Sequence, residues 1–212
     1  MSEFQSTNEK VVSVKLRSDH VYARLGSMIA FTGDIAFARS FLGNGGVQAL
    51  AMRAVTNEGI PLMTAKGTGE VFYAHAGQHV MIISPGTQTL CVEGSSVLAF
   101  DARLRAGTMF LGNQGLRSVV SGMAAGQGLF TSTFEGQGDV AILSDGNAIG
   151  LDVRPDRPLC VDPQAYLGHL GQVSSSIISD VNWKTLLGQT SGESYQMKFT
   201  GTGTVYIQAS ER

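Results

Sequence analysis

The stretch KGTGEVFYAHAG, residues 66–77, decides the fold because it occurs three times along the chain. It returns as EGQGDVAILSDG at residues 135–146 and as TGTGTVYIQAS at residues 200–210. In each copy a glycine pair precedes a segment of β-forming residues. A dinucleotide-binding fingerprint has the opposite order, with a strand, then G-x-G-x-x-G, then a helix. We therefore expect the glycines at corners of a sheet, where they take positive φ or permit close backbone approach.

A constant offset relates the first two copies of this stretch. The two cysteines lie in LCVEG and LCVDP, and 160 − 91 = 69. The same offset joins further identical residues without a gap: Gly67 and Gly136, Gly69 and Gly138, Val71 and Val140, Gly77 and Gly146, Leu90 and Leu159, and Val92 and Val161. This internal repeat predicts supersecondary units that are too small to bury a core alone and that pack on their neighbours.

A segment with helical periodicity precedes the glycines in each copy. Apolar residues recur on one helical face at i, i+3, i+4 and i+7. They are Val47, Leu50, Ala51 and Ala54 in the first copy, Leu116, Val119, Val120 and Met123 in the second, and Trp183, Leu186 and Leu187 in a shorter third. The sequence predicts an all-β fold with short helices, in a single domain, residues 1–212, of three pseudo-repeats at about 14–84, 85–153 and 154–212.

Composition and charge narrow the functional classes. The chain has 43% hydrophobic residues, 27 glycines and a net charge of −2, with no run of basic residues to follow a phosphate backbone. Nucleic acid is therefore an unfavoured partner. The sequence has no apolar stretch long enough for a signal peptide or a membrane span, and it lacks an arginine-rich transit peptide. These features predict a soluble, cytoplasmic protein.

The candidate catalytic and metal-binding patterns are all incomplete. His75 and His79 have the H-x-x-x-H spacing, but their segment is predicted as strand and turn, so ordinary histidines are expected. Ser194 in GESYQ lacks the second glycine of a nucleophile elbow. His20 and His169 stand alone in the sequence. Three acids, Asp145, Asp152 and Asp156, do not keep the spacing of a calcium loop.

The repeat itself argues against a required carboxylate. Glu70 corresponds to Asp139 and then to Thr204, as expected for a solvated strand position. Cys91 and Cys160 are expected to be small buried apolar residues, without a disulfide between them in a reducing compartment. The sequence therefore predicts no catalytic residues, no metal ligands, no cofactor and no enzymatic activity.

Three stretches carry a resemblance to a known family. They are ARLGSMIAFTGDIAFA at residues 23–38, AGQGLFTSTFEGQGDVAIL at residues 125–143 and KFTGTGTVYIQASER at residues 198–212. In these the chain resembles the mitochondrial biogenesis, or "altered inheritance of mitochondria", family, as a bacterial member. The most specific marks are GSMIAFTG and the ending Gly201, Gly203, Val205, Tyr206, Ile207 and Gln208. Pro61 departs from the aromatic-rich run usual in the family.

The resemblance implies a fold and an assembly. Family members are built as shortened double-stranded β-helix units, similar to the β-sandwich units of the tryptophan RNA-binding attenuation protein, with three units per chain and homotrimers that close a nine-unit ring. No enzymatic activity is implied. The first hypothesis is therefore a non-enzymatic scaffold or binding protein assembled as a homotrimeric ring, with unknown protein partners.

Two alternatives stay open at this point. A small-ligand or RNA-binding module is the first, by analogy with the attenuation protein. It would need a basic or aromatic stripe repeated in each unit, whereas Phe72 corresponds to Ala141 and Tyr206. A hydrolase or metal-dependent enzyme is the second, and it would rest on the scattered acids and on His75 and His79.

Overall fold

The computed structural model describes residues 2–39, 61–110, 130–179 and 195–209. The predicted all-β class is confirmed, because the strands form two antiparallel sheets and the described residues contain a single helical turn, η1 (Gly94–Ser96). The helical segments predicted around Val47, Leu116 and Trp183 lie outside these ranges. None of the helices formed by the described residues is long and apolar enough to cross a membrane.

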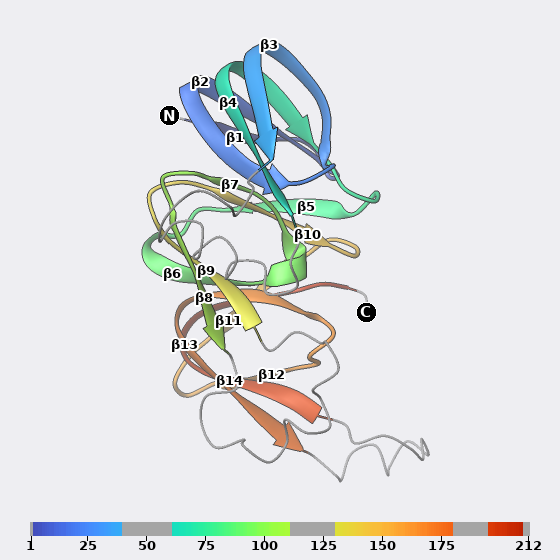
Figure 1. Cartoon of the computed structure of the whole chain (residues 1–212). Helices are drawn as coiled ribbons and strands as arrows, with labels where there is room; N and C mark the ends of the chain where they lie inside the picture. Colours follow the sequence, from blue (N-terminus) through green and yellow to red (C-terminus); the bar gives the residue numbers. More distant parts are fainter. Residues whose placement is uncertain (1, 40–60, 111–129, 180–194, 210–212) are drawn as a thin grey trace.

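The first sheet contains seven strands in the order β3-β4-β2-β7-β10-β5, with β1 paired to β2. It occupies the upper part of the molecule in Figure 1. Its strands are β1 (Glu3–Asn8), β2 (Val11–Arg24), β3 (Met28–Arg39), β4 (Leu62–Tyr73), β5 (His79–Ile83), β7 (Val97–Asp101) and β10 (Val140–Ser144).

The second sheet also contains seven strands, in the order β11-β14-β13-β6-β9-β8, with β12 paired to β14. It forms the lower part of the molecule (Figure 1). Its strands are β6 (Gly86–Glu93), β8 (Arg105–Phe110), β9 (Phe130–Gly136), β11 (Ile149–Val153), β12 (Leu159–Val161), β13 (Tyr166–Ser179) and β14 (Tyr195–Ile207).

Strand pairing follows the offset found in the sequence. Phe31 pairs with Val71 between β3 and β4, and Phe100 pairs with Val140 between β7 and β10. Each residue of the second pair lies 69 positions after its counterpart in the first pair. A register shift next to Phe31, between Met28 and Ala30 in β3, recurs between Tyr166 and Gly168 in β13, where 166 − 28 = 138, twice the offset. The offset holds further along, where Ala36 with Lys66 corresponds to Arg105 with Glu135.

In the first and third copies the glycine pairs lie inside the long strands β4 and β14, where two backbones approach closely, and not at corners of the sheet as expected. In the second copy Gly136 ends β9 and Gly138 lies in the bend before β10, where the chain passes from the second sheet to the first. Gly69 of β4 has φ +159°, and a Cβ there would lie 2.0 Å from the carbonyl oxygen of Thr32 in β3. Gly203 of β14 occupies the same place in the last hairpin, where a Cβ would lie 2.1 Å from the carbonyl oxygen of Leu170 in β13. Only glycine fits between backbones this close, so the expectation of close backbone approach is confirmed for the first and third copies.

Alternating apolar residues build a core along the stacked strands. In β2, Val12, Val14 and Leu16 are buried at every second position, as expected for a strand with one face on the core. The buried residues form three clusters in chain order. The first is centred on β2 and β4, the second on β6, β7 and β10, and the third on β14. The first and second clusters include residues of the neighbouring hairpin, such as Leu98 in the first and Leu167 in the second, so packing between hairpins contributes to the core.

Candidate functional site

Two short ladders join successive hairpins, and we call them the first and second seams. In the first seam, Val21, Tyr22 and Ala23 of β2 pair with Asp101, Phe100 and Ala99 of β7. The rings of Tyr22 and Phe100 lie opposite each other with centroids 5.3 Å apart, and Phe100 is only 1% exposed. The first seam is thus a strand-edge contact whose central pair is aromatic and largely removed from water.

The second seam has the same construction. Leu90, Cys91 and Val92 of β6 pair with Leu170, His169 and Gly168 of β13. Every partner differs from its counterpart in the first seam by 69, since 21 + 69 = 90 and 101 + 69 = 170. His169 therefore occupies the position of Phe100. The two seams are copies of one contact.

His169 is the main titratable group of the second seam. It is 2% exposed, and its Nδ1 shares a 2.7 Å hydrogen bond with the hydroxyl of Tyr166. Its ring also packs against Phe199, with centroids 6.1 Å apart. Burial lowers the pKa of His169 to about 4, so the imidazole is neutral at neutral pH. The sequence suggested only an isolated histidine.

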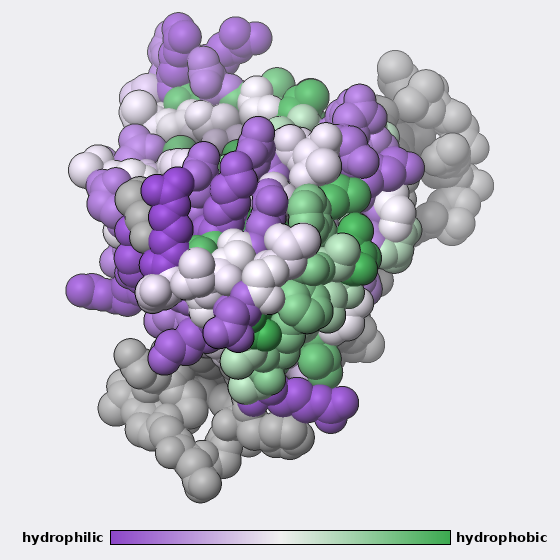
Figure 2. All heavy atoms as spheres, turned by 90° about the horizontal axis from the view of Figure 1, so that it is seen from above, coloured by the Kyte–Doolittle hydropathy of each residue, from purple (hydrophilic) through white to green (hydrophobic). Residues whose placement is uncertain are grey.

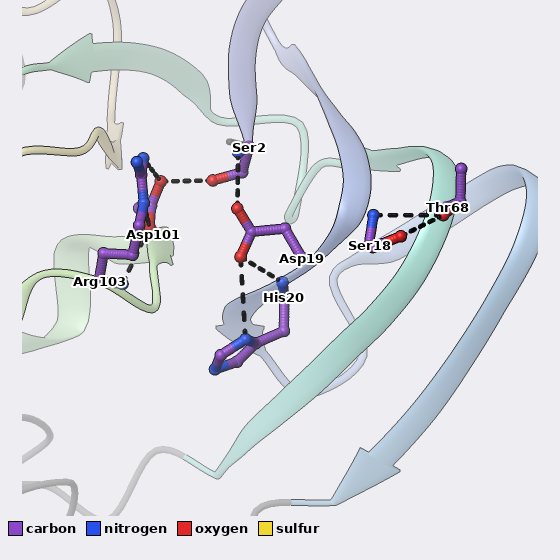
Figure 3. Close-up of polar contacts among 7 residues, drawn as sticks. All are labelled: Ser2, Ser18, Asp19, His20, Thr68, Asp101 and Arg103. Atoms are coloured by element: carbon purple, nitrogen blue, oxygen red, sulfur yellow. Dashed lines mark hydrogen bonds and ion pairs between the residues drawn. The ribbon is translucent and has the colours of Figure 1, made fainter.

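A polar cluster holds the end of the first seam (Figure 3). Asp101 is fully buried and accepts hydrogen bonds from the Ser2 hydroxyl and from Arg103, whose Nε lies 2.8 Å from Oδ1. Burial raises the pKa of Asp101, but the hydrogen bonds from Arg103 and Ser2 outweigh it and leave the pKa below its usual value. The carboxylate is therefore ionised and paired, as a buried charge must be.

Asp19 extends this cluster to β2. Its Oδ2 accepts a 3.0 Å hydrogen bond from the backbone N–H of Ser2, and its Oδ1 accepts one of 2.9 Å from the backbone of His20. Burial opposes ionisation of Asp19, and these hydrogen bonds still bring its pKa below the usual value. Together Asp19 and Asp101 fix the first residues of the chain against β2 and β7 (Figure 3).

The first and last hairpins each have a strand edge that exposes residues whose counterparts are buried in the seams. In β3, Ile29 and Phe31 are 57% and 46% exposed, and β3 pairs only with β4 among the described strands. In β12, Cys160 is exposed, and β12 pairs only with β14 within the same ranges. Figure 2, which views the end of the molecule that carries β3, shows a continuous apolar area there. Exposed apolar strand edges of this kind are templates for pairing with another chain.

Gln208, a residue of the family-like ending, connects distant parts of the chain. It is 3% exposed, its Oε1 accepts a 3.1 Å hydrogen bond from the backbone N–H of Asp145, and its Nε2 donates one of 3.1 Å to the carbonyl of Gln164. Gln78 in turn donates to Asp145 over 2.8 Å. The role of Gln208 is therefore structural, and no sequence pattern predicted its partners.

The two histidines of the H-x-x-x-H pair have separate partners. His75 Nε2 lies 3.5 Å from Nη1 of Arg24, and burial together with the charge of Arg24 lowers the pKa of His75. His79 Nε2 lies 3.5 Å from the carboxylate of Glu9. In the described part of the chain, no group of three or more His, Cys, Asp or Glu residues could hold a metal ion.

The remaining residues considered from the sequence also lie apart. Asp145 accepts the bond from Gln78, Asp152 lies 3.9 Å from Arg154 on an exposed surface, and Asp156 is exposed in the turn after β11. His20 lies beside Asp19 at 3.9 Å. Ser194 lies outside the described residues. The partners described here for Asp145, Asp152 and His20 are thus residues outside this set.

The prediction for the cysteines is right for Cys91 and wrong for Cys160. Both thiols are free, but only Cys91 is buried. The physical reason is their position in the sheet. Cys91 lies in the second seam opposite His169, whereas Cys160 has the corresponding position in β12, where the described chain places no strand on the edge away from β14.

Comparison with known proteins agrees with this architecture. A profile described as Mitochondrial biogenesis AIM24 matches residues 3–210. A crystal structure of a protein from Streptococcus pyogenes is similar with a TM-score of 0.71 and 20% sequence identity, over 100% of this chain and 94% of that chain. At this identity the likeness concerns the fold alone. A search of curated proteins gave no match. Because the profile covers nearly the whole sequence, the chain belongs to the mitochondrial biogenesis AIM24 family.

Proposed function

We propose that this protein is a non-enzymatic scaffold or binding protein that assembles as a homotrimeric ring, with three shortened double-stranded β-helix units in each chain. One observation carries the proposal. The chain contains the same strand-edge contact twice, in the first and second seams. At the two ends of the stack of hairpins, β3 and β12 each have an apolar edge that is unpaired in the described residues. Such edges favour association, because an open stack would leave them as sites of aggregation.

The units are best drawn from the pairing register. They begin at Val11, Val80 and Ile149, since 80 − 11 = 69 and 149 − 80 = 69. Each unit has three strand positions in chain order, which we call inner, outer and central, and the central strand pairs with the other two. β2, β3 and β4 have these positions in the first unit, and β11 with β12, β13 and β14 have them in the third. In the middle unit each position is divided between the two sheets.

The kind of contact in the seams allows the units to form a ring. Each seam joins the inner strand of one unit to the outer strand of the next, so the contact is head-to-tail. Contacts of this type form closed rings when the rotation between units closes, and filaments when it does not. The family resemblance supplies the number, three chains and nine units.

The buried titratable groups support a structural role. Asp101 accepts hydrogen bonds from Ser2 and Arg103, His169 is hydrogen-bonded to Tyr166 of its own strand, and both residues are buried at the seams. The free thiols of Cys91 and Cys160 are compatible with a reducing compartment, which supports our proposal of a cytoplasmic location.

Native mass spectrometry of gently purified protein tests this proposal, because it reports the assembly mass and any retained molecule together. A bare trimer of the 22.4 kDa chain is the expected result. A monomer at micromolar concentration would contradict the ring. A trimer that carries a stoichiometric small molecule or RNA fragment would replace the scaffold with a ligand-binding ring.

A further inference from the structure

The inference that follows rests on the proposed ring and specifies how it closes. We propose that a third seam joins adjacent copies of this chain, in which β12 of one copy pairs antiparallel with β3 of the next. In this seam Leu159 lies opposite Thr32, Cys160 opposite Phe31, and Val161 opposite Ala30.

The register comes from the two seams within the chain. On the inner strand, Val21 and Leu90 are equivalent, and 90 + 69 = 159 gives Leu159 as the third member. On the outer strand, Leu170 and Asp101 are equivalent, and 101 − 69 = 32 gives Thr32. The same arithmetic relates Tyr22, Cys91 and Cys160 on one side, and His169, Phe100 and Phe31 on the other. Every position of the third seam is therefore fixed without a free choice of register.

Burial distinguishes the filled positions from the open ones. At the centre of the outer strand, Phe100 is 1% exposed and His169 is 2% exposed, whereas Phe31 is 46% exposed. The same contrast occurs beside it, because Ala99 and Gly168 are buried and Ala30 is exposed.

The inner strand shows the same contrast at its central position. Cys91 is 2% exposed in the second seam, whereas Cys160 is exposed. The central residues of both halves, Cys160 and Phe31, are thus accessible in a single chain, whereas Val161 at the end of β12 is already buried at 6% exposure.

The side chains match in character. The first seam places an aromatic ring against an aromatic ring, and the second places a thiol-bearing strand position opposite His169. The third would place the Cys160 sulfur against the Phe31 ring, a favourable soft contact. Ile29, 57% exposed beside this position, extends the apolar surface available to the neighbouring chain.

The location of the two edges points to a second copy as the partner. β3 lies at one end of the stacked hairpins and β12 lies toward the other (Figure 1). A chain with complementary edges at its two ends makes head-to-tail contacts with copies of itself. The third seam continues the repeat between chains, with the backbone pattern that the first and second seams establish within one chain.

Disulfide trapping with one introduced cysteine tests the register. In a Cys91→Ala background, Phe31→Cys would face the native Cys160 of the next chain, at the separation of opposed residues in an antiparallel ladder, which a disulfide can span. We expect mild oxidation to give covalent dimers and trimers on a non-reducing denaturing gel, and reduction to restore the single chain.

A register control uses the neighbouring position. Ala30→Cys in the same background puts the thiol on the opposite face of the strand, so we expect about ten-fold less cross-linking. A second pair, Leu159→Cys with Thr32→Cys in a chain whose native cysteines are replaced by alanine, should also cross-link. This pair keeps the test decisive if Phe31→Cys fails to fold, which circular dichroism under reducing conditions would reveal.

The outcomes separate the register from the ring. A trimer by native mass that does not cross-link at either pair would overturn the third seam and leave the homotrimer standing. A trimer in which Ala30→Cys cross-links as well as Phe31→Cys would also overturn this register. A monomer by native mass would overturn the proposed ring itself.

Discussion

At the scale of single residues, the glycines in the G-x-G pairs are explained by the distance between backbones. Gly69→Ala would place a methyl group 2.0 Å from the Thr32 carbonyl, and backbone atoms of a paired strand cannot move aside without breaking the ladder. We expect a loss of about 3 kcal/mol or more in the free energy of unfolding. Urea denaturation of the purified variant measures it.

Gly77→Ala is the matched control for this substitution. Gly77 also has positive φ, at +71°, but nothing lies within 4 Å of the added Cβ. Only the backbone cost of about 1–2 kcal/mol should then appear. Equal losses at Gly69 and Gly77 would show that conformation, rather than close approach, selects glycine in the repeat.

His169 makes stability depend on pH. Its pKa is about 4 in the folded chain against 6.5 in the unfolded chain, so between these values the unfolded state binds the proton and stability falls as pH decreases. The difference, 6.5 − 4 = 2.5 units, corresponds to about 3 kcal/mol lost between pH 7 and pH 4. Urea unfolding at several pH values measures this slope.

His169→Phe tests the assignment, because phenylalanine is the residue at the equivalent position 100. We expect the slope between pH 6.5 and pH 4 to flatten in this variant, while the loss below pH 4 persists because Asp101 and Asp19, whose pKa values are lowered, are protonated there. An unchanged slope above pH 4 would assign the pH dependence to other groups.

At the scale of elements, the sequence predicted the β-strands after the glycine pairs well, because a repeat can be recognised from the order of residues alone. The offset that relates Cys91 to Cys160 also relates whole paired strands, and the β-forming segments after each glycine pair became β4, β10 and β14. The strand edges could not be predicted, because pairing between units depends on the path of the chain in space. For this reason Cys160 was expected to be buried, and the partners of His169 and Asp101 were missed.

The turn between β7 and β8 shows how one element fixes another. Arg103 follows Asp101 in this turn and donates a hydrogen bond to its carboxylate. The same carboxylate also accepts a hydrogen bond from the Ser2 hydroxyl. Arg103→Ala would leave the buried charge of Asp101 underpaired, so we expect a loss of about 3 kcal/mol in thermal or urea unfolding. Arg154→Ala, which removes an exposed pair 3.9 Å from Asp152, should cost under about 0.5 kcal/mol.

At the scale of the whole molecule, the described chain is a stack of hairpins with an unfinished contact at each end. Two seams of identical register are made within it, and β3 and β12 carry the two strand edges that we propose to form a third. The arrangement accounts for Phe31, Ile29 and Cys160, which would otherwise be unfavourably exposed on strand edges. In the proposed ring, the function of the protein would lie in the surface that the assembly presents to its partners.

The reactivity of the native thiols tests ring closure most directly, because it needs no substitution. Cys91 is buried and Cys160 is exposed in the single chain. With a colorimetric thiol reagent at neutral pH, we predict that the native assembly shows no fast-reacting thiol, since the proposed third seam would cover Cys160. Unfolded protein should show both. One fast-reacting thiol per chain in the native protein, at the rate of an exposed cysteine, would contradict closure through β12.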